Sequence, residues 1–311
     1  MVGRLSGRVV AATTAVLTGL ALSACATDTQ DASDSPDSLV FAVTPSESST
    51  SITENFTPVV EVLADELDIE VELRHMTSYA ALIEAQQAGQ VDIASYGPFA
   101  YVSAVDSGVD ITAVATGADS PDGPAVYRSY GIVPAGSGLR ELADFADRTI
   151  CFVDPTSTSG YLYPAAGLIE AGVDPVEDLT PLFLGTHDAV ALAVADGTCD
   201  GGFAHDTMVE RTLVDTGALA PGGIEVIWRS AGIPSTPVVV HNHLGEKTVE
   251  RVRDILVTHA NRDALTGAGY CDSVADCLLP KDMWGFIAVD DSSYDEIRRV
   301  CELTDAEACV N

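Results

Sequence analysis

The chain has 311 residues and is strongly acidic, because 47 Asp and Glu against 15 Lys and Arg give a formal net charge of −32 at pH 7. This balance excludes nucleic acid as an expected partner, since binding a phosphate backbone requires clustered cations. Nearly half of the residues are hydrophobic (47%), and the roughly 270 residues that follow the N-terminal segment are enough for two lobes of ordinary size.

The N-terminus has the composition of an export signal. Arg4 and Arg8 precede an apolar run at 9–22. This run is too short, and too rich in Ala, Thr and Gly, for a bilayer-spanning helix of about 20 residues. Without the two arginines the mature charge is 13 − 47 = −34.

The three residues before Cys25 are Leu-Ser-Ala, and together with Cys25 they match a bacterial lipobox. The cysteine of a lipobox is acylated and becomes the first residue of the mature protein. We therefore expect a lipoprotein signal peptide over 1–24 and a flexible tether over 25–37. The lipid on Cys25 would hold the exported body at the outer face of the bacterial cytoplasmic membrane. The alternative is an ordinary cleaved signal with an incidental cysteine.

Short strand-like and helix-like patterns then alternate. The first part predicts strands at 38–44, 69–74, 91–95 and 111–116 and helices at 52–67, 79–88 and 97–107. After Tyr127 the expected strands are 130–134, 149–153, 182–184, 201–204 and 224–230, and the helices are 139–145, 161–171, 189–195 and 207–216. One more strand begins at Val238, before helices at 247–265 and 292–300.

This alternation predicts an α/β fold of two lobes with a ligand cleft between them. Lobe 1 would comprise 38–128 plus 237–311, and lobe 2 would comprise 129–236, so that two crossovers form a hinge. We expect a monomer.

Six cysteines follow Cys25, and an even number in an exported chain favours disulfides over metal ligands. Pairing by proximity in sequence gives Cys271–Cys277, Cys301–Cys309 and, by remainder, Cys151–Cys199. Fifteen connectivities exist for six cysteines, so the other pairings stay open. Because there is no CxxC and the histidines do not cluster with the cysteines, we expect no metal and no cofactor.

Residues 154–161 (DPTSTSGY) form a hydroxyl-rich loop that runs directly into a helix. Hydroxyl donors and free backbone N–H groups at a helix N-terminus can hold an oxyanion without Lys or Arg. In so acidic a chain we expect an anion site to rely on such local dipoles. The alternative for Ser157, Thr158 and Ser159 is an N-cap run without a ligand, because Ser and Thr favour that position.

Five segments carry a resemblance to a known family. They are MTSYAALIEA (76–85), VDIASYGPFAY (91–101), FVDPTSTSGYLYP (152–164), GTHDAVALAVADGTCDGG (185–202) and VDDSSYDEIR (289–298). In this order they resemble the PhnD-like phosphate, phosphite and phosphonate substrate-binding proteins of ABC transporters, which have a periplasmic-binding-protein type II fold. The resemblance covers essentially the whole mature chain, and the TSTSG loop followed by a histidine about thirty residues later is its most specific part.

The resemblance implies a binding protein rather than an enzyme, which captures phosphite, methylphosphonate or phosphate by cleft closure and delivers it to permease subunits. Carried over by motif position, the expected ligand contacts are Ser157, Thr158, Ser159, His187, Tyr79, Tyr96, Tyr127 and Asp206. Asp206 would accept a hydrogen bond from a P–OH group, or it is only an N-cap for the following helix. Glu47 and His205 are alternative cleft residues.

One departure from the family bears on the ligand. Members that bind aminoalkylphosphonates carry an acidic residue where this chain has Thr236, within Ile-Pro-Ser-Thr-Pro at 233–237. An uncharged residue there argues against 2-aminoethylphosphonate and favours a ligand with a small substituent or none.

Three rival functions remain. One is a binding protein for another small anion, such as a sulfonate. The second is an exported ester hydrolase, which is disfavoured because the chain has no GxSxG motif and no metal-ligand cluster. The third is an adhesion or sensory lipoprotein with a vestigial cleft, which would bind no ligand.

Overall fold

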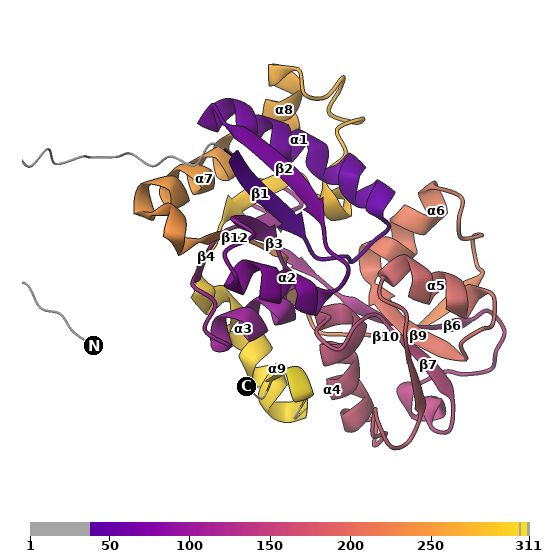
Figure 1. The fold of residues 1–311 in the computed structure, drawn as a ribbon. Coiled ribbons are helices and arrows are strands. Elements are labelled where there is room, and N and C mark those ends of the chain that lie inside the picture. The colour runs from indigo at the N-terminus through magenta and orange to yellow at the C-terminus, as the bar shows by residue number, and fades with distance from the viewer. Residues whose placement is uncertain (1–37, 305, 310–311) are drawn as a thin grey trace, which may run out of the picture. The chain divides into compact units, whose positions relative to one another are not determined.

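The computed structural model describes residues 38–304 and 306–309 (Figure 1). The expected signal peptide (1–24), the lipidation site Cys25 and the tether (25–37) lie outside these residues. Across the described part of the chain, no helix combines the length and the apolar character needed to cross a bilayer.

The first of the two main sheets has six strands in the order β13-β4-β12-β3-β1-β2. Its strands are β1 (Ser38–Val43), β2 (Glu70–His75), β3 (Ile93–Ser95), β4 (Ile111–Ala118), β12 (Pro237–His241) and β13 (Gly285–Ala288). β1 is parallel to β2 and β3, whereas β12 is antiparallel to β3 and β4, and β13 is antiparallel to β4.

Helices bury both faces of this sheet. They are α1 (Ser49–Leu67), α2 (Tyr79–Gln87), α3 (Pro98–Asp106), α7 (Glu246–His259), α8 (Arg262–Ala268) and α9 (Asp295–Thr304). Leu39, Phe41 and Val43 of β1 pack with α1 and α7, whereas Ala42 belongs to the cluster that contains α2, α3 and α9. Side chains alternate between the two faces of a strand, so a central strand covered on both faces is apolar throughout.

The second main sheet has five strands in the order β10-β6-β9-β7-β8. Its strands are β6 (Ser129–Pro134), β7 (Thr149–Phe152), β8 (Thr180–Phe183), β9 (Gly201–His205) and β10 (Ile224–Arg229). Its helices are α4 (Tyr163–Glu170), α5 (His187–Ala195) and α6 (Leu213–Asp215), with the 3-10 turn η1 (Leu142–Phe145) and the π-helical turns η2 (Thr158–Leu162) and η3 (Met208–Thr212).

The chain passes between the two sheets through a pair of very short strands. β5 (Val126–Tyr127) and β11 (Ile233–Pro234) pair antiparallel to each other. Two neighbouring crossovers of this kind can act as a hinge, because only a few residues must change their backbone angles when the two sides move.

The sequence predicted most of this alternation, with a few differences. The helix expected at 247–265 is two helices, because Ala260 leaves the helical region (φ −91°, ψ 58°) and the side chain of Asn261 caps α8 by accepting from the N–H of Ala264. The helix expected at 139–145 is the single turn η1. β13, β5 and β11 were not predicted from the sequence.

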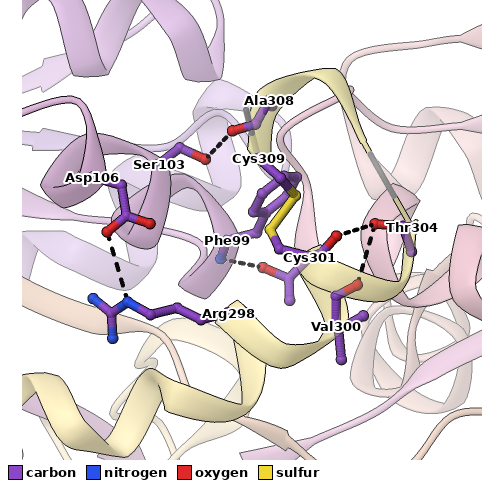
Figure 2. The surroundings of a disulfide bond; sticks show 10 residues. Phe99, Ser103, Asp106, Arg298, Val300, Cys301, Thr304, Ala308 and Cys309 are labelled. Carbon is purple, nitrogen blue, oxygen red and sulfur yellow. Dashed lines mark hydrogen bonds and ion pairs between the residues drawn. A yellow bond between two sulfur atoms is a disulfide. The ribbon is translucent and has the colours of Figure 1, made fainter. Parts of the chain in front are cut away.

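The structure contains the three expected disulfides, Cys151–Cys199, Cys271–Cys277 and Cys301–Cys309. Figure 2 shows how the last of them holds the end of the described chain against α3. Ser103 Oγ of α3 donates to the carbonyl of Ala308 (3.1 Å), and Arg298 of α9 pairs with Asp106 (3.7 Å). These contacts fix the helix whose first turn reaches the candidate site.

The remaining short turns are η4 (Asn242–Leu244), η5 (Pro280–Asp282), η6 (Asp291–Tyr294) and η7 (Glu307–Cys309). Of these, η5 contributes to the candidate site.

Candidate ligand-binding cleft

A cavity of about 120 Å³ is lined by residues of the first sheet, by loop and helix-start residues that follow strands of the second sheet, and by residues of both crossovers. This volume is enough for several water-sized groups. Seven of the eight expected ligand residues line it: Tyr79, Tyr127, Ser157, Thr158, Ser159, His187 and Asp206. Many of the lining residues follow the carboxyl ends of strands, where α/β sheets commonly place their ligands.

The hydroxyl-rich loop enters the cavity as the first turn of a helix. Ser157 is its N-cap, and Ser157 Oγ accepts from the N–H of Gly160 (3.1 Å). Ser157 therefore has the N-cap role that the sequence analysis gave as the alternative to ligand binding. Nevertheless, Ser157, Thr158 and Ser159 all line the cavity and are at most 2% exposed. Gly160 is required, because a Cβ there would collide with Val153 and with Ser157 Oγ.

The two sides of the cleft meet directly at this loop. Phe99 N, in the first turn of α3, donates to Thr158 Oγ1 (2.8 Å), and His187 N donates to the carbonyl of Ser46 (3.0 Å). The hydroxyl of Tyr79 interacts with Ser157. The described arrangement is therefore closed around the loop.

His187 begins α5 with its imidazole in a defined tautomer. The N–H of His205 donates to His187 Nδ1 (3.2 Å), so the proton of a neutral ring is on Nε2. Burial, with a contribution from the positive charge of Lys281, lowers the pKa of His187 to about 3. His187 is thus a neutral donor at physiological pH.

His205 supports this histidine from β9. Its Nδ1 accepts from the N–H of Met208 (3.1 Å), which leaves its own proton on Nε2. That Nε2 atom is buried without a hydrogen-bond partner and lies 3.9 Å from Glu47 Oε1. Burial, then the neighbouring His187 and Lys281, lower the pKa of His205.

Glu47 and Asp206 are two of the carboxyl groups that line the cavity beside these donors. Glu47 is 8% exposed, and burial raises its pKa to about 7, an effect that Lys281 partly offsets. Burial also raises the pKa of Asp206, although its two oxygens accept from the N–H groups of Thr207 (2.9 Å) and Arg128 (3.0 Å). Each oxygen of Asp206 keeps a second lone pair for a P–OH donor.

Lys281 is the functional candidate that the sequence analysis missed. It lines the cavity from η5, and its Nζ donates to Thr236 Oγ1 (2.7 Å) and lies 3.9 Å from the centre of the Tyr127 ring. Burial lowers its pKa to about 8, partly offset by Glu47 and Asp206. An anion site was expected to rely on local dipoles, and this cavity also contains an ammonium. The only sequence feature that could have drawn attention to Lys281 is the scarcity of lysine, of which the chain has two.

Tyr96 is the expected site residue that does not line the cavity. Its side chain is fully buried, and its hydroxyl has no hydrogen-bond partner. The neighbouring Ser95 and Gly97 do line the cavity. Side chains alternate along an extended chain, so Tyr96 faces the opposite way, into the core.

The described residues contain no group of three or more His, Cys, Asp or Glu side chains that could hold a metal ion. The polar groups of the cleft are instead hydroxyls, a neutral imidazole, buried carboxyls and one ammonium. This set offers donors for the oxygens of an anion and acceptors for its protonated oxygens.

Comparisons with known proteins point to one family. A family model described as "ABC transporter, phosphonate, periplasmic substrate-binding protein" matches residues 41–294. The chain is 36% identical over 310 residues to the phosphate-import protein PhnD of Mycolicibacterium smegmatis, covering 96% of this chain and 97% of that protein.

Solved structures show the same fold. A binding-protein component of an ABC phosphonate transporter from Pseudomonas aeruginosa has a TM-score of 0.74 at 26% identity, covering 88% of this chain and 89% of its own. A Prochlorococcus marinus protein in complex with methylphosphonate has a TM-score of 0.75 at 18% identity, covering 87% of this chain and 99% of that chain. The expected two-lobed periplasmic-binding-protein fold is confirmed.

Proposed function

Because this chain belongs to the phosphonate family of ABC-transporter substrate-binding proteins, we propose that it captures a small phosphorus oxyanion in the cleft and delivers it to permease subunits of an importer. Proteins of this family bind substrates for transport and are not enzymes. The family is exported, and the candidate ligands are phosphate, phosphite and methylphosphonate.

The observation that carries this proposal is the meeting of the Ser157–Ser159 turn with the His187 Nε2–H donor in one closed cavity. Three short hydroxyls and a neutral imidazole give four donors to a tetrahedral anion without a full positive charge. The positive end of the helix that follows Ser157 adds about 0.3 to 2 kcal/mol for an anion placed there.

Cleft closure would couple binding to a change of shape. The bond from Phe99 N to Thr158 Oγ1 and the bond from His187 N to Ser46 join the two sides only when they are together. We propose that the sides are lobe 1, 38–128 plus 237–311, and lobe 2, 129–236. The ligand would shift the equilibrium to the closed form, which the permease recognises.

Calorimetric titration of the purified protein tests the ligand class. The panel is phosphate, phosphite, methylphosphonate, 2-aminoethylphosphonate, sulfate and taurine. We expect binding of at least one of the first three and neither of the sulfur ligands. A ligand at 100 times its Kd should also stabilise the protein by about 2.7 kcal/mol. Preference for sulfate or taurine, or no binding of any phosphorus oxyanion, would refute the proposal.

A matched pair of variants tests the Ser157–Ser159 turn, called the hydroxyl turn below. Thr158→Val removes a hydroxyl that lines the cavity, whereas Thr156→Val removes one in the same loop that bonds only to Asp154. We expect Thr158→Val to weaken binding at least tenfold and Thr156→Val to change it less than threefold. Equal effects of the two variants would contradict a ligand contact by the Thr158 hydroxyl.

We further propose that a lipid on Cys25 anchors a monomer to the outer face of the cytoplasmic membrane. The lipobox sequence supports this. Cys25→Ser should release the exported protein into the soluble fraction and abolish incorporation of labelled fatty acid. Unchanged membrane association of this variant would contradict the anchor.

A further inference from the structure

We propose that the Lys281 ammonium contacts the ligand directly and makes the cleft select an anion with oxygen at all four vertices, as in inorganic phosphate, over phosphonates and phosphite. This inference rests on the proposed function and deepens it. It concerns a wall of the cavity formed by η5, far in the sequence from the Ser157–Ser159 turn.

The hydrogen bonds of Lys281 leave one donor unused. An ammonium has three N–H donors. One donates to Thr236 Oγ1, and the ring of Tyr127 lies 3.9 Å from Nζ, at cation–π distance. Across residues 38–304 and 306–309, no carboxylate lies within ion-pair distance of Lys281. A partly buried ammonium that lacks an anionic partner is costly, and a bound anion would supply that partner.

The charges around the cavity make Lys281 its electrostatic centre. Its charge acts on Glu47, His187, His205 and Asp206, which face the cavity or its edge. Among the described lining residues, Lys281 is the one cation, whereas Glu47, Asp119 and Asp206 are acids. An anion in this cavity therefore has a single full positive charge to approach.

The turn that presents Lys281 is conformationally unusual. Lys281 (φ 53°) and Asp282 (φ 56°) are consecutive residues in the left-handed region, which is unfavourable for a non-glycine residue. Two arginines hold the turn in place, because Arg211 from η3 and Arg262 from α8 both pair with Asp282. Strain of this kind persists where surrounding contacts enforce it, and it is concentrated at functional sites.

Tyr127 relates this wall to the hydroxyl turn. Its hydroxyl interacts with Thr158 and Ser159, and the Lys281 ammonium lies over its ring. A tetrahedral anion that presents three vertices to the hydroxyl turn and His187 therefore presents its fourth toward the wall formed by η5. An oxygen there can accept from Lys281, whereas a methyl group or a P–H hydrogen leaves the donor unpaired, and an amino group is repelled.

Replacement of the two lysines of the chain tests the inference. Lys281→Met removes the ammonium, and Lys247→Met removes an exposed one on α7. We expect Lys281→Met to weaken phosphate binding about 10- to 100-fold, as expected for loss of a charged hydrogen bond, and to weaken methylphosphonate binding at least threefold less, because that anion loses only the attraction of the charge. Lys247→Met should bind like the wild type.

The outcomes separate this inference from the function on which it rests. Wild-type protein that binds no phosphorus oxyanion refutes the function itself. Wild-type protein that binds phosphate, with Lys281→Met either equal to it or equally impaired for phosphate and methylphosphonate, refutes only the role of Lys281.

A second measurement needs no variant and applies even if Lys281→Met fails to fold. An amine-reactive acetylating reagent, read by mass spectrometry, can report only two lysine side chains in this sequence. Under saturating phosphate we expect acetylation of Lys281 to slow at least tenfold, and to slow less under saturating methylphosphonate, while Lys247 is unaffected. Equal protection of Lys281 by both ligands would mean that closure alone shields it, which would overturn the inference.

Discussion

Replacing Glu47 by Gln should stabilise the ligand-free protein, and only above the pH at which the unfolded carboxyl ionises. Glu47 is 8% exposed, and burial raises its pKa from 4.5 to about 7. Between these values the folded chain keeps a proton that the unfolded chain releases. The contribution of this group to stability is therefore fully present below pH 4.5 and is lost as the pH rises toward 7.

The magnitude follows from the same two values. The difference between 4.5 and about 7, at about 1.36 kcal/mol for each pKa unit, corresponds to about 3 kcal/mol lost above pH 7. Gln keeps the shape and cannot ionise, so Glu47→Gln should be about 3 kcal/mol more stable than the wild type at pH 8 and about equal at pH 4.5. For a folded body of this size the gain corresponds to about 5 °C in Tm.

Urea denaturation at the two pH values measures this difference. Glu54→Gln, which changes an exposed residue of α1, is the control and should alter the free energy of unfolding by less than about 0.5 kcal/mol. If Glu47→Gln has the same effect at pH 4.5 and pH 8, the carboxyl does not titrate as a buried group, and the electrostatic account of the cleft is wrong.

Three further predictions concern the contacts that close the cleft. Thr158→Val leaves the N–H of Phe99 without its acceptor in the closed form, so in urea denaturation with saturating ligand it should cost about 1 to 3 kcal/mol of stability. In long-range ¹H–¹⁵N spectra, His187 should stay neutral with its proton on Nε2 from pH 5 to 8, because its pKa is about 3; an imidazolium at pH 6 would contradict this. Arg211→Ala removes an exposed ion pair to Asp282, so calorimetry should show less than a fivefold loss of affinity, and this loss should be smaller still at high salt. A loss of affinity that is larger than fivefold and independent of salt would argue against a solvent-screened contact.

Local sequence patterns were enough to predict most of the fold. The strand–helix alternation depends on side-chain periodicity, which neighbouring residues carry by themselves, as in β1 and α1. β13 was missed because its four residues, GFIA, are too few to show a period and become a strand only by pairing with β4, which lies more than a hundred residues earlier. The two-residue strands β5 and β11 likewise exist only through their mutual pairing.

The candidate site likewise contains residues that local patterns predicted and residues that they did not. The Ser157–Ser159 turn and His187 lie where loops enter helices, so motif and spacing were enough to find them, and both line the cavity. Tyr96 was misplaced because one position along an extended strand end reverses the direction of a side chain. Lys281 was missed because no local pattern marks it, and its role depends on a left-handed turn held by distant arginines.

Lys281 also changes how this acidic chain can hold an anion. The net charge of −32 sets a repulsive long-range potential, but salt screens that potential over about 10 Å, whereas groups inside the closed cleft act with little screening. At neutral pH Lys281, with a pKa of about 8, is mostly charged, and Glu47, with a pKa of about 7, is about half protonated. An arriving anion favours the protonated form of Glu47, so the cleft reduces its own negative charge as it binds. The affinity of the site therefore depends on a few buried groups rather than on the charge of the surface.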